Sequence, residues 1–257
     1  MSAIAFTLGP LTIRWYGILI VCGIIVAMLV SWRLLLRQSI SFDDLLDAAL
    51  VAVPLGLLCA RLYYVAFNWG YYGAHPEHIL AVWRGGLAIH GSILGGVLGI
   101  WLVARHKGQS LAVWLDGVAP GVLLAQAIGR WGNFFNQEAY GYETDLPWAM
   151  YIDGAMRHPT FLYESLWDLA GFCLLLWLSL RLGRRLYRGD VAAAYLIYYS
   201  LGRCFIEYFR TDSLMLGPLK MAQVISLAGV ALGLLILYVN RRQGGKRADK
   251  GGRNAHE

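Results

Sequence analysis

Seven long apolar runs constrain this chain more than any other feature of its sequence. A helix needs about 20 apolar residues to cross the hydrocarbon core of a bilayer, and within that core only helices or closed barrels satisfy their backbone hydrogen bonds. Only 15% of the 257 residues are charged, against roughly 25% in a soluble domain, and the mean hydropathy is +0.52. The sequence therefore predicts an all-α integral membrane protein, a bundle of seven transmembrane helices. The predicted spans are residues 16–36, 45–67, 85–104, 111–128, 160–180, 191–209 and 219–239.

The connecting segments indicate how this bundle is oriented. Alternate loops carry clusters of arginine and lysine, and the positive-inside rule places such loops in the cytoplasm. The N-terminus is then expected outside and the C-terminus inside. Residues 129–160 contain no run long enough to cross, so they are expected to form a small polar arm on the outer face. The cytoplasmic clusters are Arg33 with Arg37, Arg105 with Lys107, and the arginines at 181, 184, 185 and 188.

Residues 1–240 are expected to form one membrane-embedded domain. The remaining residues, 241–257, are rich in glycine, lysine and arginine, and we expect them to form a basic, disordered cytoplasmic tail. This tail and the short loops account for much of the net charge of +6. The charge therefore does not indicate a nucleic-acid partner.

Two patterns predict how individual helices pack. Gly91, Gly95 and Gly99 repeat at intervals of four, which forms a ridge of small residues that lets two helices approach closely. Arg61 lies inside the second span, where an arginine is costly and usually faces the protein interior or a cavity.

The stretch from Gly129 to Gly141, GRWGNFFNQEAYG, is the strongest candidate for a functional site. Arg130 offers a planar fork of donors that suits a phosphate, and Asn133 and Glu138 follow within the same stretch. The predicted topology brings polar groups from other spans to the same outer level. These groups are Tyr16, His90, Tyr163, Glu164, and the residues Arg203, Glu207 and Arg210, whose spacing places them on one helical face.

Several of these residues also have a purely structural interpretation. Arg203 and Glu207 can neutralise one another inside the bundle. Tyr16 suits an aromatic belt at the interface, His90 suits a satisfied interior position, and Glu164 suits the start of a helix. The convergence of independent spans on one level favours a site over these separate explanations.

The residue types favour an anionic lipid headgroup as the ligand. Arginines at the outer leaflet suit its phosphate, asparagine and tyrosine suit a glycerol portion, and a histidine that titrates near neutrality can accept a proton. The sequence contains no serine elbow, no paired metal carboxylates and no P-loop. We therefore expect no metal ion and no cofactor.

Five separated motifs carry a resemblance to a known family. Besides Gly129–Gly141 they are Ile13–Gly17 (IRWYG), Gly86–Gly91 (GLAIHG), His158–Glu164 (HPTFLYE) and Arg203–Arg210 (RCFIEYFR). In order and spacing they resemble the bacterial prolipoprotein diacylglyceryl transferases over nearly the whole chain, excluding the tail. The agreement of five motifs makes the resemblance highly specific.

The resemblance implies a transferase of the bacterial cytoplasmic (inner) membrane, with seven helices and a periplasmic arm or head region. Members of the family take the diacylglyceryl group from phosphatidylglycerol. They transfer it to the lipobox cysteine thiol of a prolipoprotein signal peptide, so that a thioether forms and glycerol phosphate leaves. The implied partners are phosphatidylglycerol, prolipoprotein signal peptides and membrane lipids, with the N-terminus and the active site on the periplasmic side.

The resemblance also implies roles for individual residues. Arg130 matches the family's phosphatidylglycerol-binding arginine. We predict that His90 takes the thiol proton, that Arg130 and Arg203 stabilise the departing phosphate, and that Glu207 holds Arg203 in place. Further matching or substrate-binding positions are Tyr16, Asn133, Glu138, Gly141, Tyr163, Glu164 and Arg210.

Two other classes of function remain open from the residues alone. A lipid transporter or flippase that binds an anionic headgroup could also have seven spans with interior charges, although the sequence shows no internal repeat. A non-catalytic membrane scaffold would not need a histidine and three arginines at one depth.

Overall fold

The computed structural model describes residues 2–9, 11–213 and 215–253, and most of them are helical. Among these residues, five helices are long and apolar enough to cross a membrane, and the chain is a multi-pass membrane protein. These five segments are Trp15–Gln38, Phe42–Phe67, Leu111–Asn136, Thr160–Leu182 and Met221–Arg242. Two further helices, Ile89–His106 and Asp190–Ile206, are shorter. The count of seven spans therefore stays a prediction.

The chain divides into two compact units, which are described separately. Unit 1 consists of residues 1–34 and 115–257, and unit 2 consists of residues 35–114. The helices of unit 1 are α1 (Trp15–Leu35), most of α5 (Leu111–Asn136), α6 (Thr160–Trp177), α7 (Asp190–Ile206) and α8 (Met221–Arg253).

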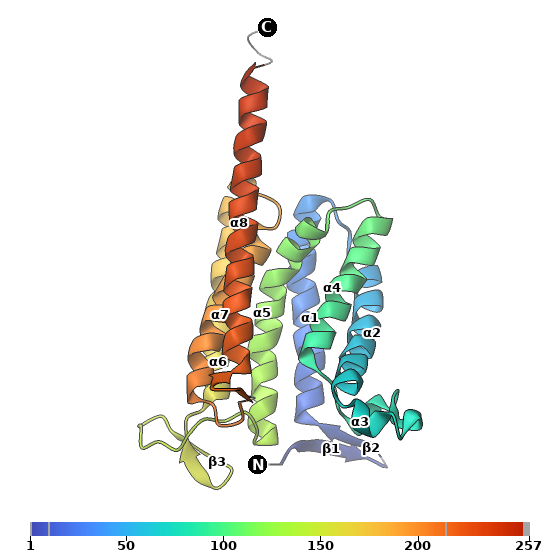
Figure 1. Cartoon of the computed structure of the whole chain (residues 1–257), viewed down its shortest axis with the longest axis vertical. Coiled ribbons are helices and arrows are strands. Elements are labelled where there is room, and N and C mark those ends of the chain that lie inside the picture. The colour runs from blue at the N-terminus through green and yellow to red at the C-terminus, as the bar shows by residue number, and fades with distance from the viewer. Residues whose placement is uncertain (1, 10, 214, 254–257) are drawn as a thin grey trace. The chain divides into compact units, whose positions relative to one another are not determined.

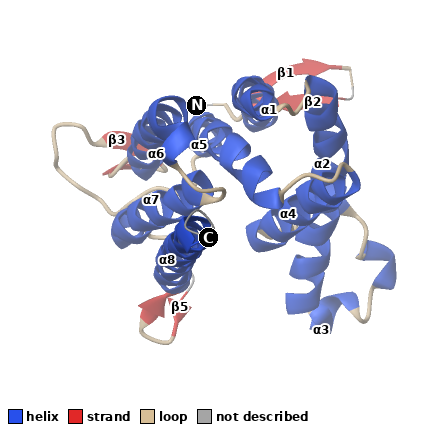
Figure 2. Cartoon of the chain, turned by 90° about the horizontal axis from the view of Figure 1, so that it is seen from above, coloured by secondary structure: helices blue, strands red, loops and turns tan. Residues whose placement is uncertain are grey.

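In unit 1, the ends of four helices meet at one level. Helices α5 and α7 end, and α6 and α8 begin, at the lower end of the unit in Figure 1, where the β3 hairpin also lies. Figure 2 views these helices end-on, with α7 next to both α6 and α8. Side chains from consecutive helices can therefore meet there, although they are far apart in the sequence.

Small residues allow the close packing of α1 with α5. Gly23 of α1 faces Ala125, and Gly121 of α5 faces Ala27 and Ser31. A β-carbon on Gly121 would lie 2.6 Å from the carbonyl oxygen of Ala27. This approach is closer than a side chain allows, so the two backbones are in direct contact, as is common between membrane helices.

Three short antiparallel hairpins complete unit 1. They are β1 (Ile4–Leu8) with β2 (Leu11–Arg14), β3 (Met150–Ile152) with β4 (Ala155–Arg157), and β5 (Met215–Leu216) with β6 (Leu219–Lys220). The turn between β3 and β4 uses Asp153 and Gly154, both with positive φ, which matches the twist of a tight hairpin. Ile152 is buried against Phe134 and Phe161, so this hairpin is packed onto the ends of α5 and α6.

One predicted boundary was wrong. Helix α5 continues to Asn136, so the first eight residues of Gly129–Gly141 are helical and the polar arm begins later than residue 129. The polar residues of this part do not by themselves end the helix. Its two glycines each lower helix stability by only about 1 kcal/mol relative to alanine. Helix α8 is described as far as Arg253, and the disordered tail expected over 241–257 stays a prediction. Residues 254–257 of this tail lie outside the described residues.

Unit 2 is built on the packing of α2 (Phe42–Phe67) against α4 (Ile89–His106), with the short α3 (Trp69–Tyr72) between them in the chain. Ser41 and Asp44 form a capping box at the start of α2, which satisfies two backbone N–H groups there. The predicted glycine ridge is confirmed. A methyl group on Gly91, Gly95 or Gly99 would collide with α2 at Cys59, Leu55 or Ala52.

Arg61 faces the interior of unit 2, as predicted, and is only 1% exposed. Its guanidinium donates hydrogen bonds to four backbone carbonyls of the segment between α2 and α4 and lies over the ring of Tyr72. The acceptors are the carbonyl oxygens of His78 (2.6 Å), Ile79 (2.8 Å), Gly85 (2.5 Å) and Gly86 (3.1 Å). Arg61 therefore fixes the path of residues 78–86, which lead directly into α4 and His90.

We expect Arg61→Ala to destabilise unit 2 by about 3 kcal/mol, because it leaves four partly buried carbonyls without their donor. Arg61→Lys keeps the charge but not the fork, and we expect a smaller loss. The measurement is the midpoint of thermal unfolding in detergent. The matched control is Arg37→Ala, which removes an exposed arginine of the same unit and should leave the midpoint nearly unchanged. Equal midpoints for the Arg61 and Arg37 variants would contradict this prediction.

Candidate functional site

The second half of the stretch Gly129–Gly141 turns the chain away from α5. Gln137 and Ala139 have φ of 53° and 57°, the left-handed conformation that ends many helices. The side chain of Gln137 donates to the carbonyl of Phe134 at 2.9 Å and accepts from the backbone N–H of Asp153 at 3.0 Å. The end of α5 is thus bound to the turn of the β3–β4 hairpin.

Gly141 lies where three chain segments meet. Its N–H donates to the carbonyl of His158 at 3.0 Å, and the N–H of Tyr142 donates to the carbonyl of Phe209 at 3.0 Å. A β-carbon at Gly141 would lie 2.7 Å from the β-carbon of His158 and 2.9 Å from the oxygen of Phe209. Only glycine therefore lets the segment after α5 pair with the segment after α7, and this pairing sets the backbone next to Arg210.

A buried carboxylate with three arginines lies at the level where the helices of unit 1 end. Glu164, in the second turn of α6, is only 3% exposed. Its Oε2 lies 2.9 Å from Nη1 of Arg130, while its Oε1 accepts from Nη1 of Arg203 and, at 3.3 Å, from Nη1 of Arg210. Glu164 thus joins α5, α7 and the segment after α7. Burial of one carboxylate among three guanidinium groups is favourable only because every member has a partner.

Two further carboxylates, those of Glu207 and Asp212, also bind arginines of this cluster. Nη2 of Arg203 lies 2.7 Å from Glu207, four residues along the chain. Arg210 donates two parallel hydrogen bonds to Asp212, at 3.0 and 2.8 Å. Burial favours the neutral carboxyl of Asp212, but the hydrogen bonds and charge of Arg210 outweigh this effect, so the pKa of Asp212 lies below its ordinary value.

Lys220 holds the backbone of the same region. Its ammonium group donates to the carbonyls of Glu207 at 2.7 Å and Arg210 at 3.0 Å. These carbonyls follow the end of α7, where a cation is favourable. Lys220, in strand β6, therefore holds in place the segment that carries Glu207 and Arg210.

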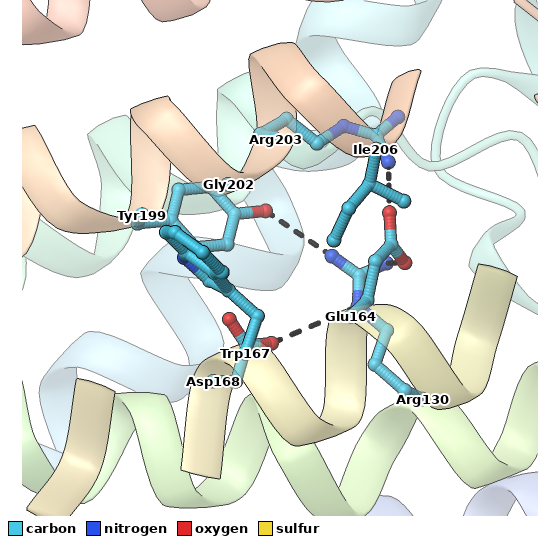
Figure 3. A pocket seen from close by; sticks show the side chains of 8 residues that line it. All are labelled: Arg130, Glu164, Trp167, Asp168, Tyr199, Gly202, Arg203 and Ile206. Carbon is cyan, nitrogen blue, oxygen red and sulfur yellow. Dashed lines mark hydrogen bonds and ion pairs between the residues drawn. The ribbon is translucent and has the colours of Figure 1, made fainter. Parts of the chain in front are cut away.

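A small cavity adjoins this cluster of charged residues (Figure 3). Its cavity volume is about 10 Å³, which is room for about one water molecule, so a larger group can enter only if the lining side chains move apart. The hydroxyl of Tyr199 accepts from Arg130 at 3.2 Å, and the carboxylate of Asp168 lies 3.9 Å from Nε of Arg130. The lining residues are Arg130, Glu164, Trp167, Asp168, Tyr199, Gly202, Arg203 and Ile206.

Comparison with known proteins identifies the family. A model of the family described as prolipoprotein diacylglyceryl transferase matches residues 3–239. The chain belongs to this family. It is 49% identical over 243 residues to a phosphatidylglycerol–prolipoprotein diacylglyceryl transferase of Clostridioides difficile. The matched region covers 94% of this chain and 97% of that relative. Relatives with the same description from Nostoc sp. and Limosilactobacillus reuteri are 49% and 44% identical, covering 91% and 95% of this chain and 89% and 92% of their own lengths.

Of the residues predicted for this transferase site, unit 1 brings five into the cluster of charged residues. They are Arg130, Glu164, Arg203, Glu207 and Arg210. Tyr16 lies close to the same stretch, because its ring packs where Gly132 leaves room. The hydroxyl of Tyr163 instead bonds to Trp148 at 2.8 Å and to His158 at 3.1 Å.

Two residues of the stretch Gly129–Gly141 lie outside this cluster. Among the described residues, the carboxylate of Glu138 accepts only from the side chain of Asn136, at 3.2 Å. The backbone carbonyl of Asn133 accepts a hydrogen bond from the backbone N–H of Glu138. The side-chain amide of Asn133 is half-buried and has no partner in the part of the chain that the structure describes. The amide of Asn133 is therefore available to a ligand.

His90 belongs to unit 2, where its half-buried ring lies against Tyr63 with centroids 5.8 Å apart. The cluster of charged residues belongs to unit 1. The convergence of His90 with the arginines of this family member therefore stays a prediction.

Sequence reasoning missed Asp168, Tyr199, Asp212 and Lys220. Asp168 could have been found, because an acidic residue within an apolar span is itself a signal of function, and it follows Glu164 by one helical turn. Tyr199 and Lys220 had no such signal. Tyrosine is common in this chain, and lysine at a span end suits the interface equally well. Among the described residues, no group of three or more His, Cys, Asp or Glu side chains is placed to hold a metal ion.

Proposed function

We propose that this chain transfers the diacylglyceryl group of phosphatidylglycerol to the lipobox cysteine thiol of prolipoproteins. The printed names of its relatives describe a phosphatidylglycerol–prolipoprotein diacylglyceryl transferase. The single observation that carries the proposal is the set of three arginines around buried Glu164, two of which line the adjoining cavity. A membrane protein rarely buries such charges without a functional reason.

Arg130 and Arg203 are the proposed phosphate ligands. A guanidinium has five N–H groups. Among the described residues, Arg130 donates one hydrogen bond, to Tyr199, and forms ion pairs with Glu164 and Asp168. Donors therefore remain for an incoming phosphate. As the bond to phosphate breaks, negative charge grows on the departing oxygen, and fixed cations that stabilise it are often the largest contribution to catalysis.

Glu164 and Glu207 are the proposed supports of these arginines. Each carboxylate contacts Arg203, and Glu164 also contacts Arg130. A guanidinium held on one edge by a buried carboxylate presents its other N–H groups in a fixed direction. Preorganisation of this kind avoids reorganisation at the moment of reaction.

The thiol must lose its proton before it attacks. Its ordinary pKa is about 8.5, and the thiolate is the nucleophile. We assign the base to His90. In the proposed step, sulfur bonds to the glyceryl carbon, the bond from that carbon to the phosphate oxygen breaks, and glycerol phosphate leaves with the electron pair. The proton goes to His90.

The remaining predicted residues are proposed to position the substrates. The unpaired amide of Asn133 suits the glycerol portion of the headgroup, and Tyr16 of α1 packs against the neighbouring Gly132. Tyr163 and Glu138 are proposed to contact substrate at the polar arm, and Gly141 to fix the backbone that carries Arg210.

The proposed topology has seven spans, a small periplasmic arm, the N-terminus in the periplasm and the C-terminus in the cytoplasm. Residues 1–240 form the membrane domain in this proposal, in the bacterial inner membrane. The basic loops support this orientation through the positive-inside rule. A reporter fused to the C-terminus should be active only in the cytoplasm, and activity in the periplasm would invert the topology.

The activity is tested with purified protein, phosphatidylglycerol and a synthetic lipobox peptide. The expected product is a peptide whose cysteine carries a diacylglyceryl thioether, detected by mass spectrometry, together with one glycerol phosphate per thioether. A peptide in which serine replaces the cysteine is the control and should give no product. Absence of the thioether with the cysteine peptide would refute the proposed function.

A further inference from the structure

Asp168 is the one acidic residue lining the cavity whose charge is not matched by a hydrogen bond. It is only 2% exposed, and its Oδ2 is buried without a hydrogen-bond partner among the described residues. Its ion-pair partner there, Nε of Arg130, lies 3.9 Å away, which is beyond hydrogen-bond distance. A buried carboxylate oxygen without a donor is costly, so this oxygen calls for an explanation.

The position of Asp168 within the cavity suggests what it binds. It follows Glu164 by one turn of α6 and so lies on the same face of this helix. Figure 3 shows the guanidinium of Arg130 between the carboxylates of Glu164 and Asp168, with the hydroxyl of Tyr199 on the same side as Asp168. Glu164 already contacts three arginines, whereas Asp168 has an acceptor to spare.

The charge of Asp168 limits the class of ligand. An ionised carboxylate can only accept hydrogen bonds, so it repels a phosphate oxygen and attracts a hydroxyl. A ligand that fits Arg130 and Asp168 together must carry a phosphate next to at least one hydroxyl group.

We propose that Asp168 is a specificity-determining residue that accepts a hydrogen bond from a hydroxyl of the glycerol headgroup of the lipid donor. This inference rests on the proposed function, because it takes phosphatidylglycerol as the donor. Arg130 and Arg203 bind the phosphate, and Asp168 reads the hydroxyl groups attached to it. A headgroup without hydroxyls leaves Asp168 unpaired, and a site built to bind a hydroxyl rejects the analogue that lacks it.

The test compares two lipid donors that differ only in those hydroxyls, phosphatidylglycerol and phosphatidyl-1-propanol. For the unaltered enzyme, we expect kcat/KM to be at least tenfold higher with phosphatidylglycerol. Asp168→Ala should lower kcat/KM for phosphatidylglycerol by roughly 10- to 100-fold, the usual effect of a hydrogen bond to a charged group. It should change kcat/KM for phosphatidyl-1-propanol by no more than about threefold. Asp168→Asn keeps an acceptor oxygen. We expect its ratio of kcat/KM values for the two donors to lie between that of the unaltered enzyme and that of Asp168→Ala.

Equal losses for both donors would overturn the proposal, because Asp168 would then act only through Arg130. Equal rates with both donors in the unaltered enzyme would overturn it as well. If the enzyme transfers from neither donor, the proposed function itself fails.

A binding measurement tests the same contact without turnover. It uses the soluble headgroup, glycerol phosphate, in place of the intact lipid. We expect glycerol phosphate to raise the midpoint of thermal unfolding more than inorganic phosphate does at equal concentration. In Asp168→Ala this difference should disappear, while the effect of inorganic phosphate persists. An unchanged difference in Asp168→Ala would overturn the proposal even if the transfer assay gave no product.

Discussion

Arg130→Ala is expected to lower kcat/KM for diacylglyceryl transfer by roughly 10³-fold, the upper range for loss of one preorganised donor in an active site. The reason is that Arg130 faces the cavity with donors to spare, while Glu164 and Tyr199 hold it in place. The variant should still fold and insert, because Glu164 keeps its contacts with Arg203 and Arg210. The measurements are the rate of thioether formation and the amount of protein in the membrane fraction.

Two further variants sharpen this prediction. Arg130→Lys keeps the positive charge but cannot contact Glu164, Asp168 and Tyr199 from one planar group, so we expect a large loss of activity here as well. Arg241→Ala is the matched control. Arg241 forms an ion pair with Asp190 at 2.8 Å. Asp190 is the first residue of α7, whereas Arg203 of the cluster of charged residues lies in the last turn of that helix, so loss of Arg241 should leave the rate unchanged. Full activity in Arg130→Ala would remove Arg130 from the site.

The helices of this protein could be predicted because each membrane span must be apolar over its whole length. The predicted spans therefore coincide with α1, α2, α4, α5, α6, α7 and α8 apart from their ends. The ends could not be predicted, because hydropathy reports where the membrane stops and not where the helix stops. Helix α5 shows the difference, since it continues through Arg130 and Asn133 to Asn136. The turn after it depends on Gln137 contacting the β3–β4 hairpin, a contact that no local pattern encodes.

The members of the site were partly predictable for a related reason. Spacing along one helix brings Arg203 and Glu207 together, and that pair is present at 2.7 Å. The central role of Glu164 depends on contacts across three chain segments, and sequence spacing does not contain this information. From the residues alone, Glu164 was equally well explained as an acid at a helix start.

Glu164→Gln is expected to be the most damaging single substitution for both folding and activity. The change keeps the shape of the side chain but leaves Arg130, Arg203 and Arg210 close together without the carboxylate they share. Removing one partner from a buried ion pair typically costs about 3–5 kcal/mol, because the remaining charge stays buried. We therefore expect a lower midpoint of thermal unfolding in detergent and a loss of transfer activity at least as large as in Arg130→Ala.

Glu143→Gln is the matched control for this prediction, because it makes the same chemical change in unit 1 at an exposed carboxylate. Glu143 lies 3.3 Å from Arg157, and its side chain is 69% exposed, so the pair should contribute at most about 1 kcal/mol. A small effect in Glu143→Gln with a large one in Glu164→Gln would attribute the loss to burial among arginines and not to loss of a carboxylate as such. If Glu164→Gln unfolds at the same temperature as the unaltered protein, Glu164 does not hold the arginines together. The preorganisation proposed for Arg130 and Arg203 would then need another source, and Asp168 and Glu207 would be the remaining candidates.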